Sequence, residues 1–429
     1  MLSSVLSTAL LVAATSGVPH GPPSPPSGPG HNGPGGPPGY GPPPSRPGPF
    51  PAPTGPAPPS QTGLQPYGFF VNNTIYTTSG SEHSTYPRYT ELMDGTILAT
   101  SSLSGHSPPY FPIFESKDGG ASWKYISNLT DQVNGLGFAA QPGLSQLTFD
   151  IGDYKKGTIL GTGNSWGSNS TNIDLYSSVD GARTWQFVSN IARGTRPNTT
   201  NGATPIWEPY LLPYDGELVA YYSDQRDMHY GQKLSHQTST DLKIWGPVVN
   251  DVVYDDNYEA RPGMTVVAYV PPIDKWVFVH ERPIGNSSSY GQHYPVYYKL
   301  AKDPRDFRLS PDMPLVVGNK TAPNASPYVV WTPEPKGSKY GTIVVSDADT
   351  RSVFTNQLGG DIDAWEEHGT AAGAVYSRAI QILKTKPDHL LIYGGDTYDG
   401  QQAGEHIPFS ASVFNINDVL KKGANDYSV

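Results

Sequence analysis

The 429-residue sequence predicts an all-β fold, a β-propeller of six four-stranded antiparallel blades arranged in a ring. Two patterns along the chain predict this architecture: a repeat of about sixty residues and a series of six hairpin signals. The composition agrees with it, since 27 Tyr, 8 Trp and 47 Gly suit short strands that are joined by tight turns.

The repeat ends each time on an aromatic residue. Its two best copies, SKDGGASW and SVDGARTW, share the form S-x-D-G-x-x-[ST]-W, and degenerate copies are STDLKIW, AKDPRDF and GGDIDAW. The final aromatics are 62, 60, 62 and 58 residues apart, which suits one four-stranded blade per copy. They are Trp123, Trp185, Trp245, Phe307 and Trp365. We expect each aspartate to bond amides of its own turn and each aromatic to pack between blades, so we interpret the aspartates as structural.

Six pairs of apolar strands, each joined by a turn, predict the number of blades. The pairs are YTEL/TILATS, PGLSQLTF/GTILGTG, EPYLLP/ELVAYYS, GMTVVAYV/KWVFVHE, YVVWTPE/GTIVVSD and RAIQILK/HLLIYGG. A further strand at Phe409–Phe414 follows the last pair, and a strand near Tyr67–Tyr76 precedes the first. We expect these end strands to close the ring, because closure removes the exposed edges of an open array.

The first 66 residues are expected to lie outside the propeller, which we assign to residues 67–429. An apolar run, Val5–Ala14, followed by small residues predicts a secretory signal over residues 1–17. Residues 18–66 are mostly Pro, Gly and Ser, and with little apolar surface to bury they are expected to form a disordered linker.

We therefore expect a secreted, extracellular glycoprotein, in line with seven N-glycosylation sequons. The sequons stand at Asn72, Asn128, Asn169, Asn198, Asn286, Asn319 and Asn324. The chain has no cysteine, so its stability depends on packing rather than on disulfides.

Charge and motifs exclude several classes of protein. The net charge of −10 and the pI of about 5.5 argue against nucleic-acid binding, which needs a basic surface. No segment approaches the roughly 18 apolar residues of a membrane span, and no zinc motif or G-x-S-x-G elbow occurs. The acidic run Tyr254–Glu259 is open to calcium binding, although a solvated loop is favoured. We expect a monomer that needs no cofactor or metal.

Polar and ionisable residues gather on one rim of the predicted ring. In an antiparallel hairpin, the start of the first strand and the end of the second lie at the same edge. The first strands begin at Arg88, Gln141, Glu208, Arg261, Tyr328 and Tyr376, and the second strands end at Asn164, Asp224, Glu281 and Asp347. A polar rim around a central depression predicts a ligand site.

Two glutamates of this rim are the candidates for catalysis. Glu208 opens an apolar strand, and Glu281 ends the strand KWVFVHE of the next blade, so the two are expected to face each other. Burial raises the pKa of one carboxyl, while a cation such as Arg88 or Arg261 keeps the other ionised. Glycosidases use such pairs, at about 5–5.5 Å for retention and about 6.5–9.5 Å for inversion. The alternative is that each glutamate only caps or pairs at a blade edge.

Further rim residues are expected to bind substrate. They are Arg88, Gln141, Asn164, Trp207, Tyr222, Asp224, Gln225, Arg261, Tyr328 and Arg378. Trp207, Tyr222 and Tyr328 are candidates for stacking on sugar rings, although propellers also use such aromatics for packing. Tyr376, in YSR, is either a core aromatic or a hydroxyl aimed at the reacting sugar.

Over about Tyr86–Gly395 the chain resembles the fungal exo-arabinanases of glycoside hydrolase family 93. The segments that carry the resemblance are WEPYLLPYDGELVAYYSDQRDMHYGQKLSHQTSTDLKIWGPVV, ARPGMTVVAYV, YPRYTELMDGTIL, QPGLSQL…GTILGTGNSW, SPYVVW and YSRAI. The resemblance implies a sialidase-like six-bladed propeller, Glu208 and Glu281 as catalytic glutamates, and Tyr376 as a site tyrosine. It also implies retaining release of arabinobiose from the non-reducing ends of α-1,5-linked L-arabinan.

The roles of the two glutamates do not follow from the sequence, and our preferred assignment is Glu208 as nucleophile and Glu281 as acid/base. The continuation HERPIG after the second strand departs from the small residues expected there, so Arg282 is a candidate for changing the leaving-group site. Two other functions stay open. A sialidase needs an arginine cluster, for which Arg88, Arg261 and Arg378 are available, and usually a tyrosine nucleophile. A non-catalytic carbohydrate-binding propeller needs neither.

Overall fold

The computed structural model describes residues 68–283, 294–318, 322–396 and 407–428. The predicted signal, the predicted linker and the sequons at Asn286 and Asn319 lie outside these residues. Two helical turns occur in the described chain, η1 (Pro271–Ile273) and α1 (Ile416–Val419). No described helix has the length and apolar character that crossing a membrane requires.

The other regular structure of the described residues consists of 24 strands in six sheets of four. The first twelve are β1 (Phe70–Tyr76), β2 (Ser84–Glu91), β3 (Ile97–Leu103), β4 (Phe111–Ser116), β5 (Lys124–Leu129), β6 (Ala140–Gln146), β7 (Ile159–Trp166), β8 (Ser170–Ser178), β9 (Gln186–Thr195), β10 (Ile206–Tyr214), β11 (Glu217–Asp224) and β12 (Lys233–Ser239). The second twelve are β13 (Val249–Val252), β14 (Gly263–Val270), β15 (Lys275–Glu281), β16 (Val296–Ala301), β17 (Met313–Pro314), β18 (Tyr328–Thr332), β19 (Thr342–Ser346), β20 (Ser352–Asn356), β21 (Trp365–Gly369), β22 (Ile380–Leu383), β23 (Lys386–Gly394) and β24 (Phe409–Asn415).

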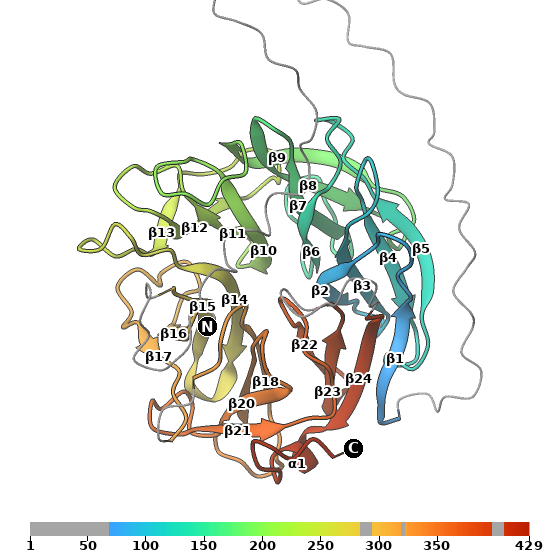
Figure 1. The fold of residues 1–429 in the computed structure, drawn as a ribbon, viewed down its shortest axis with the longest axis vertical. Coiled ribbons are helices and arrows are strands. Elements are labelled where there is room, and N and C mark those ends of the chain that lie inside the picture. Colours follow the sequence, from blue (N-terminus) through green and yellow to red (C-terminus); the bar gives the residue numbers. More distant parts are fainter. Residues whose placement is uncertain (1–67, 284–293, 319–321, 397–406, 429) are drawn as a thin grey trace, which may run out of the picture. The chain divides into compact units, whose positions relative to one another are not determined.

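Each sheet is one blade of a ring, with β2, β6, β10, β14, β18 and β22 nearest the centre (Figure 1). Five blades are built from four consecutive strands. The sixth has the order β1-β24-β23-β22, so strands from both ends of the described chain meet in one sheet. Phe70 lies opposite Val413 in the antiparallel pair of β1 and β24. The prediction of six four-stranded blades and of closure by the end strands is confirmed.

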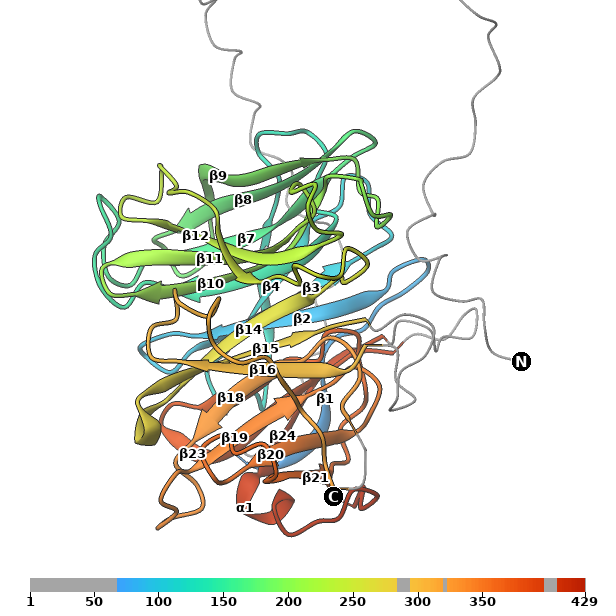
Figure 2. The ribbon, with the colours of Figure 1, turned by 90° about the vertical axis from the view of Figure 1, so that its left-hand side faces the viewer.

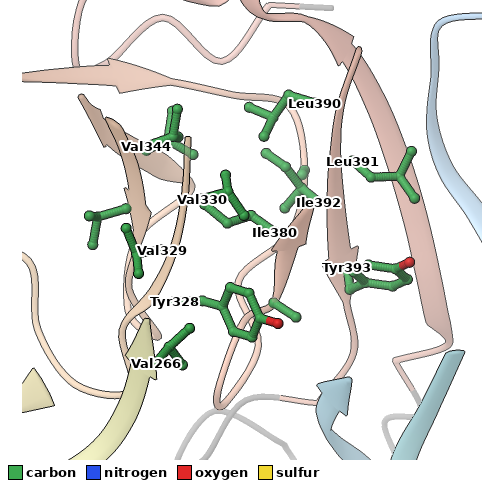
Figure 3. Packing of buried hydrophobic residues seen from close by; sticks show 14 of the residues in the cluster. Val266, Tyr328, Val329, Val330, Val344, Ile380, Leu390, Leu391, Ile392 and Tyr393 are labelled. Carbon is green, nitrogen blue, oxygen red and sulfur yellow. The ribbon is translucent and has the colours of Figure 1, made fainter. Parts of the chain in front are cut away.

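The six predicted hairpins are the two inner strands of each blade, and in the side view the strands of β10–β12 and β14–β16 cross the thickness of the ring (Figure 2). These strands are apolar because they are covered on both faces by neighbouring blades. Figure 3 shows such an interface, where Val330 of β18 lies near Ile380 of β22 and Ile392 of β23. Each such side chain contributes about 1.5–3 kcal/mol when it is fully buried.

The repeated aspartates lie in the turns between the third and fourth strands of their blades. Oδ1 of Asp118 accepts hydrogen bonds from the amide of Ser122 and the hydroxyl of Ser116, both at 2.9 Å. Asp180 accepts from the amides of Arg183 and Thr184, both at 3.0 Å. These carboxylates are occupied by their own turns, at a distance from the centre of the ring.

A left-handed residue stands at or just before the start of each innermost strand. These residues, with φ between 48° and 66°, are Tyr86, Gln141, Glu208, Met264, Ser326 and Ser377. In β2, β6, β10 and β14 the register shifts at this point, as in a β-bulge. A bulge redirects the following side chains and sets the left-handed amide apart from the strand pairing. All six amides therefore lie at the rim where the polar residues were predicted.

Candidate active site

The two glutamates lie on adjacent blades, on either side of Gly263. Glu208 is the third residue of β10, Glu281 is the last residue of β15, and Gly263 pairs with Glu281 across the hairpin of β14 and β15. A Cβ atom at Gly263 would lie 3.2 Å from Oε2 of Glu208 and 3.4 Å from Oε1 of Glu281. These two oxygens are therefore no more than 6.6 Å apart, the sum of the two distances. The predicted proximity of the pair is present in the structure.

One oxygen of Glu208 is held firmly. Its Oε2 accepts hydrogen bonds from the hydroxyl of Ser223, at 2.6 Å, and from the amide of Met264, at 2.8 Å. Its Oε1 has no hydrogen-bond partner among the described residues. Burial raises the pKa of Glu208, whereas these two hydrogen bonds and the positive charges of Arg261 and Arg88 oppose the rise. The surroundings thus favour the ionised form more strongly here than at Glu281.

Glu281 has a more apolar and more acidic environment. Its Oε2 accepts one hydrogen bond, from the amide of Ser326 at 2.6 Å. Burial raises the pKa of Glu281 to about 8, the negative charges of Glu208 and Asp349 add to the rise, and the Ser326 amide opposes it. At neutral pH this carboxyl is protonated and able to donate a proton.

Gln141 and Asn164 hold the strand that carries Glu208. The amide of Glu208 donates to Oε1 of Gln141 at 2.9 Å, and Nδ2 of Asn164 donates to the same oxygen at 3.3 Å. Asn164 also donates to the carbonyl of Ile206 at 2.7 Å, and it is fully buried. These two predicted substrate-binding residues therefore link the blade of β6–β9 to the strand start at Glu208.

Side-chain amides surround the guanidinium of Arg261. It donates to Gln225 at 3.0 Å, to Gln232 at 2.9 Å and to Asn201 at 2.8 Å. Trp207 donates its indole N–H to the same oxygen of Gln225 at 2.8 Å, and it is almost completely buried. Arg261 has no carboxylate partner in the described part of the chain, so its charge acts on Glu208. Trp207 packs in this network rather than offering an open face to a sugar.

Arg88 lies between aromatic rings where the first and last blades meet. Its guanidinium carbon is 4.0 Å from the ring centre of Tyr86 and 5.2 Å from that of Tyr328. The ring of Tyr86 meets the ring of Tyr376 edge to face at 6.1 Å. Burial raises the pKa of Tyr86, and the charges of Glu208 and Glu281 both add to this rise. Tyr86 thus stands close to both glutamates, together with the predicted tyrosine Tyr376.

Other predicted residues are placed away from the glutamates. The fully buried guanidinium of Arg378 donates to the backbone carbonyls of Thr350 and Ser352, at 2.9 and 2.8 Å. Its neighbour in space is Asp347, whose pKa burial raises to about 6. Arg378 is therefore enclosed within the protein, and the structure does not present it to a ligand.

Tyr222 and Asp224 form a second buried group. The hydroxyl of Tyr222 donates to Gln237 at 2.7 Å, and Asp224 pairs with Arg226 at 2.8 Å. Both predicted residues are engaged inside their own blade.

Arg282 turns toward the blade rather than toward the glutamates. Its guanidinium carbon is 3.9 Å from the ring centre of Tyr254 and 5.5 Å from that of Tyr297. In the acidic run Tyr254–Glu259, Asp255 pairs with Arg308 at 2.9 Å. The described residues contain no group of three or more His, Asp or Glu side chains that could hold a metal ion.

Sequence reasoning missed five residues that contact or neighbour the pair: Tyr86, Ser223, Gly263, Met264 and Ser326. A signal was present for two of them. Four of the six left-handed residues precede a proline, in Tyr86-Pro87, Gln141-Pro142, Glu208-Pro209 and Ser326-Pro327. Proline has no N–H to leave unpaired where a bulge interrupts the ladder, so the repeated dipeptide marks the bulge.

Comparisons with known proteins define the class of this propeller. No protein-family model and no curated protein matches the chain. Among solved structures, a GH93 α-L-arabinofuranosidase of Fusarium graminearum in complex with arabinobiose is 41% identical, with a TM-score of 0.77 over 82% of this chain and 99% of that one. The same values hold for an α-L-arabinofuranosidase of this fungus with an iminosugar inhibitor.

An α-L-arabinanase of Penicillium chrysogenum complexed with arabinobiose is 39% identical, with a TM-score of 0.76 over 82% of this chain and 99% of that one. The NanB sialidase of Streptococcus pneumoniae, at 10% identity and a TM-score of 0.51, shares the fold alone; it spans 81% of this chain and 71% of that one. The protein is thus a propeller glycoside hydrolase. It belongs to glycoside hydrolase family 93.

Proposed function

We propose that this protein is a secreted exo-arabinanase that releases arabinobiose from the non-reducing ends of α-1,5-L-arabinan with retention of configuration. The observation that carries the proposal is the pair of glutamates with opposite environments, Glu208 and Glu281. Their nearest bounded oxygens lie within 6.6 Å of each other, which admits the about 5–5.5 Å of retaining enzymes and falls below nearly all of the inverting range of about 6.5–9.5 Å. Relatives in complex with arabinobiose support the choice of sugar.

Glu208 is assigned as the nucleophile. Ser223, the Met264 amide and the charge of Arg261 favour its carboxylate form, and its Oε1 has no protein hydrogen bond to break before attack. Oε1 would attack the anomeric carbon, forming a glycosyl ester as the bond to the leaving arabinan oxygen breaks.

Glu281 is assigned as the acid/base. With a pKa of about 8 it carries a proton at neutral pH and would donate it to the departing oxygen. The resulting carboxylate then takes a proton from water, whose oxygen attacks the anomeric carbon and releases the sugar from Glu208. Two displacements at one carbon retain the configuration.

A sialidase is disfavoured by the position of Arg378. A sialoside carboxylate needs a cluster of accessible arginines, and Arg378 is fully buried with its N–H groups on backbone carbonyls. Arg88, moreover, is enclosed by Tyr86 and Tyr328.

Product analysis tests the proposal. Linear arabinan is expected to yield arabinobiose alone at early times, with the α-anomer appearing first by NMR. Glu208→Gln and Glu281→Gln should each lower kcat/KM by a factor of about 10³ or more. Glu91→Gln is the matched control, because Glu91 is a buried carboxyl at the far end of β2, bonded to Gln381. A first product of inverted configuration, full turnover by either glutamate variant, or sialoside hydrolysis without arabinan hydrolysis would overturn the assignment.

A further inference from the structure

The amides of two left-handed residues point at the two glutamates. Met264 has φ 66° and donates to Oε2 of Glu208, and Ser326 has φ 48° and donates to Oε2 of Glu281. In both cases the amide belongs to the blade that follows the one carrying the glutamate. A left-handed backbone is unfavourable for a residue with a side chain, and such strain persists only where its surroundings enforce it.

The same contact recurs around the ring, which separates it from coincidence. The amide of Gln141 donates to the hydroxyl of Ser102 at 3.0 Å, and the amide of Glu208 donates to Gln141 at 2.9 Å. Both bonds again run from a left-handed residue to a side chain of the preceding blade. At four successive blade junctions, therefore, this amide fixes one side chain, and at two of them the side chain is a glutamate of the pair.

The hydrogen bonds select one oxygen of each carboxylate. Oε2 of Glu208 is held by Ser223 and Met264, and Oε2 of Glu281 is held by Ser326. Among the described residues, neither Oε1 atom has a hydrogen-bond partner. Holding one oxygen fixes the plane of the carboxyl group and leaves the other oxygen free to react.

We propose that the left-handed amides of Met264 and Ser326, together with the hydroxyl of Ser223, are positioning groups that fix Oε2 of each glutamate, so that the Oε1 atoms are the reacting atoms. The proposal deepens the proposed function and rests on it. It assigns Oε1 of Glu208 to bond formation with the sugar and Oε1 of Glu281 to proton transfer. Ser223 and Ser326 act through the glutamates and need not touch the substrate.

Ser223→Ala tests the arm at Glu208. The variant should lower kcat/KM by about 10-fold to 100-fold, the range for a hydrogen bond to a charged group. Because the lost bond favoured the ionised form, the acidic limb of the pH profile should move to higher pH while the basic limb stays in place. Ser235→Ala is the matched control: Ser235 is a buried serine on the neighbouring strand β12, and its hydroxyl has no partner.

Ser326→Val and Ser326→Gly test the arm at Glu281. Valine is strained at a positive φ and glycine is not, while both keep an amide and both remove a hydroxyl that has no partner. Ser326→Val should have at least about 10-fold lower kcat/KM than Ser326→Gly, with the basic limb moved to higher pH because the lost amide bond favoured ionised Glu281.

The outcomes separate positioning from stability and from the proposed function. Loss of activity without movement of the expected limb, or activity within about twofold of wild type in both Ser223→Ala and Ser326→Val, would overturn the positioning role. If the wild type fails to cleave arabinan, the proposed function fails, and carbon-13 NMR titration of the glutamate carboxyls in the full chain still decides the positioning. Ser223→Ala must then raise the pKa of Glu208, and Ser326→Val that of Glu281; unchanged titrations would reject the proposal.

Discussion

Gly263 of β14 lies directly opposite Glu281 of β15, and a side chain at this glycine would enter the space between the two glutamates. The residue needs no unusual backbone conformation, so its absence of a side chain matters for space alone. Glycine here allows two carboxyl groups from adjacent blades to approach one sugar.

Gly263→Ala is therefore expected to lower kcat/KM on linear arabinan by about 100-fold, because displacement of a reacting group by around 1 Å has an effect of this size. The added methyl would lie 3.2 Å from Glu208 and 3.4 Å from Glu281. Steady-state kinetics and a thermal melt measure the effect. Gly373→Ala, whose methyl meets nothing within 4 Å, is the control, and unchanged kinetics of Gly263→Ala would contradict the assigned geometry.

The rate should depend on pH with a basic limb near pH 8, set by Glu281. This glutamate must be protonated to act as an acid, and its pKa is raised to about 8, so kcat/KM should fall above that pH. An aryl α-L-arabinobioside with an acidic phenol leaving group needs little protonation, and its basic limb should weaken or vanish for the glycosylation step. A basic limb that is identical for both substrates would argue against Glu281 as the acid.

The same carboxyl should make the stability of the fold depend on pH. Its pKa rises from 4.5 to about 8 on folding, so its contribution is fully present below about pH 4.5 and is lost as the pH rises through about 8. Glu281→Gln should therefore melt at a higher temperature than the wild type at about pH 8, and the difference should shrink toward pH 4.5. Calorimetry at both pH values checks the sign, and Glu91→Gln serves for comparison.

Arg378 should matter for stability and not for substrate binding. Removing its buried guanidinium in Arg378→Met leaves several carbonyls without donors and should lower the free energy of unfolding by about 3 kcal/mol. The KM of the folded variant should stay near the wild-type value. Arg351→Met, at an exposed neighbour, is the control for the melt. A large rise in KM at unchanged stability would restore Arg378 as a ligand-binding residue.

Much of the fold and part of the site could be predicted from the sequence. The hairpins and the sixty-residue repeat report local periodicity, and each blade is a local unit, so six blades, the closing strands and the proximity of Glu208 and Glu281 follow. The side-chain directions near a bulge do not follow, because a shift of one residue exchanges the two faces of a strand. Arg378, directly after left-handed Ser377, shows this: the rim position was predictable and the inward burial was not.

The environments of the two carboxyls were also out of reach. The contrast between them depends on which amide, hydroxyl or arginine of another blade approaches each oxygen, as Ser223 does for Glu208 and Ser326 for Glu281. These partners are separated in the chain by 15 and 45 residues, and their approach is a property of the assembled ring.

The junction between the first and last blades has a consequence for biosynthesis. The amide of Tyr86 donates to the carbonyl of Tyr376 there, the amide of Ser84 donates to Asp396, and β1 waits for β24 to complete its sheet. A ribosome releases these partners more than three hundred residues apart. A nascent chain thus carries both glutamates long before Tyr86, Arg88 and Tyr376 can assemble beside them, and it acquires hydrolytic competence only when synthesis is nearly finished.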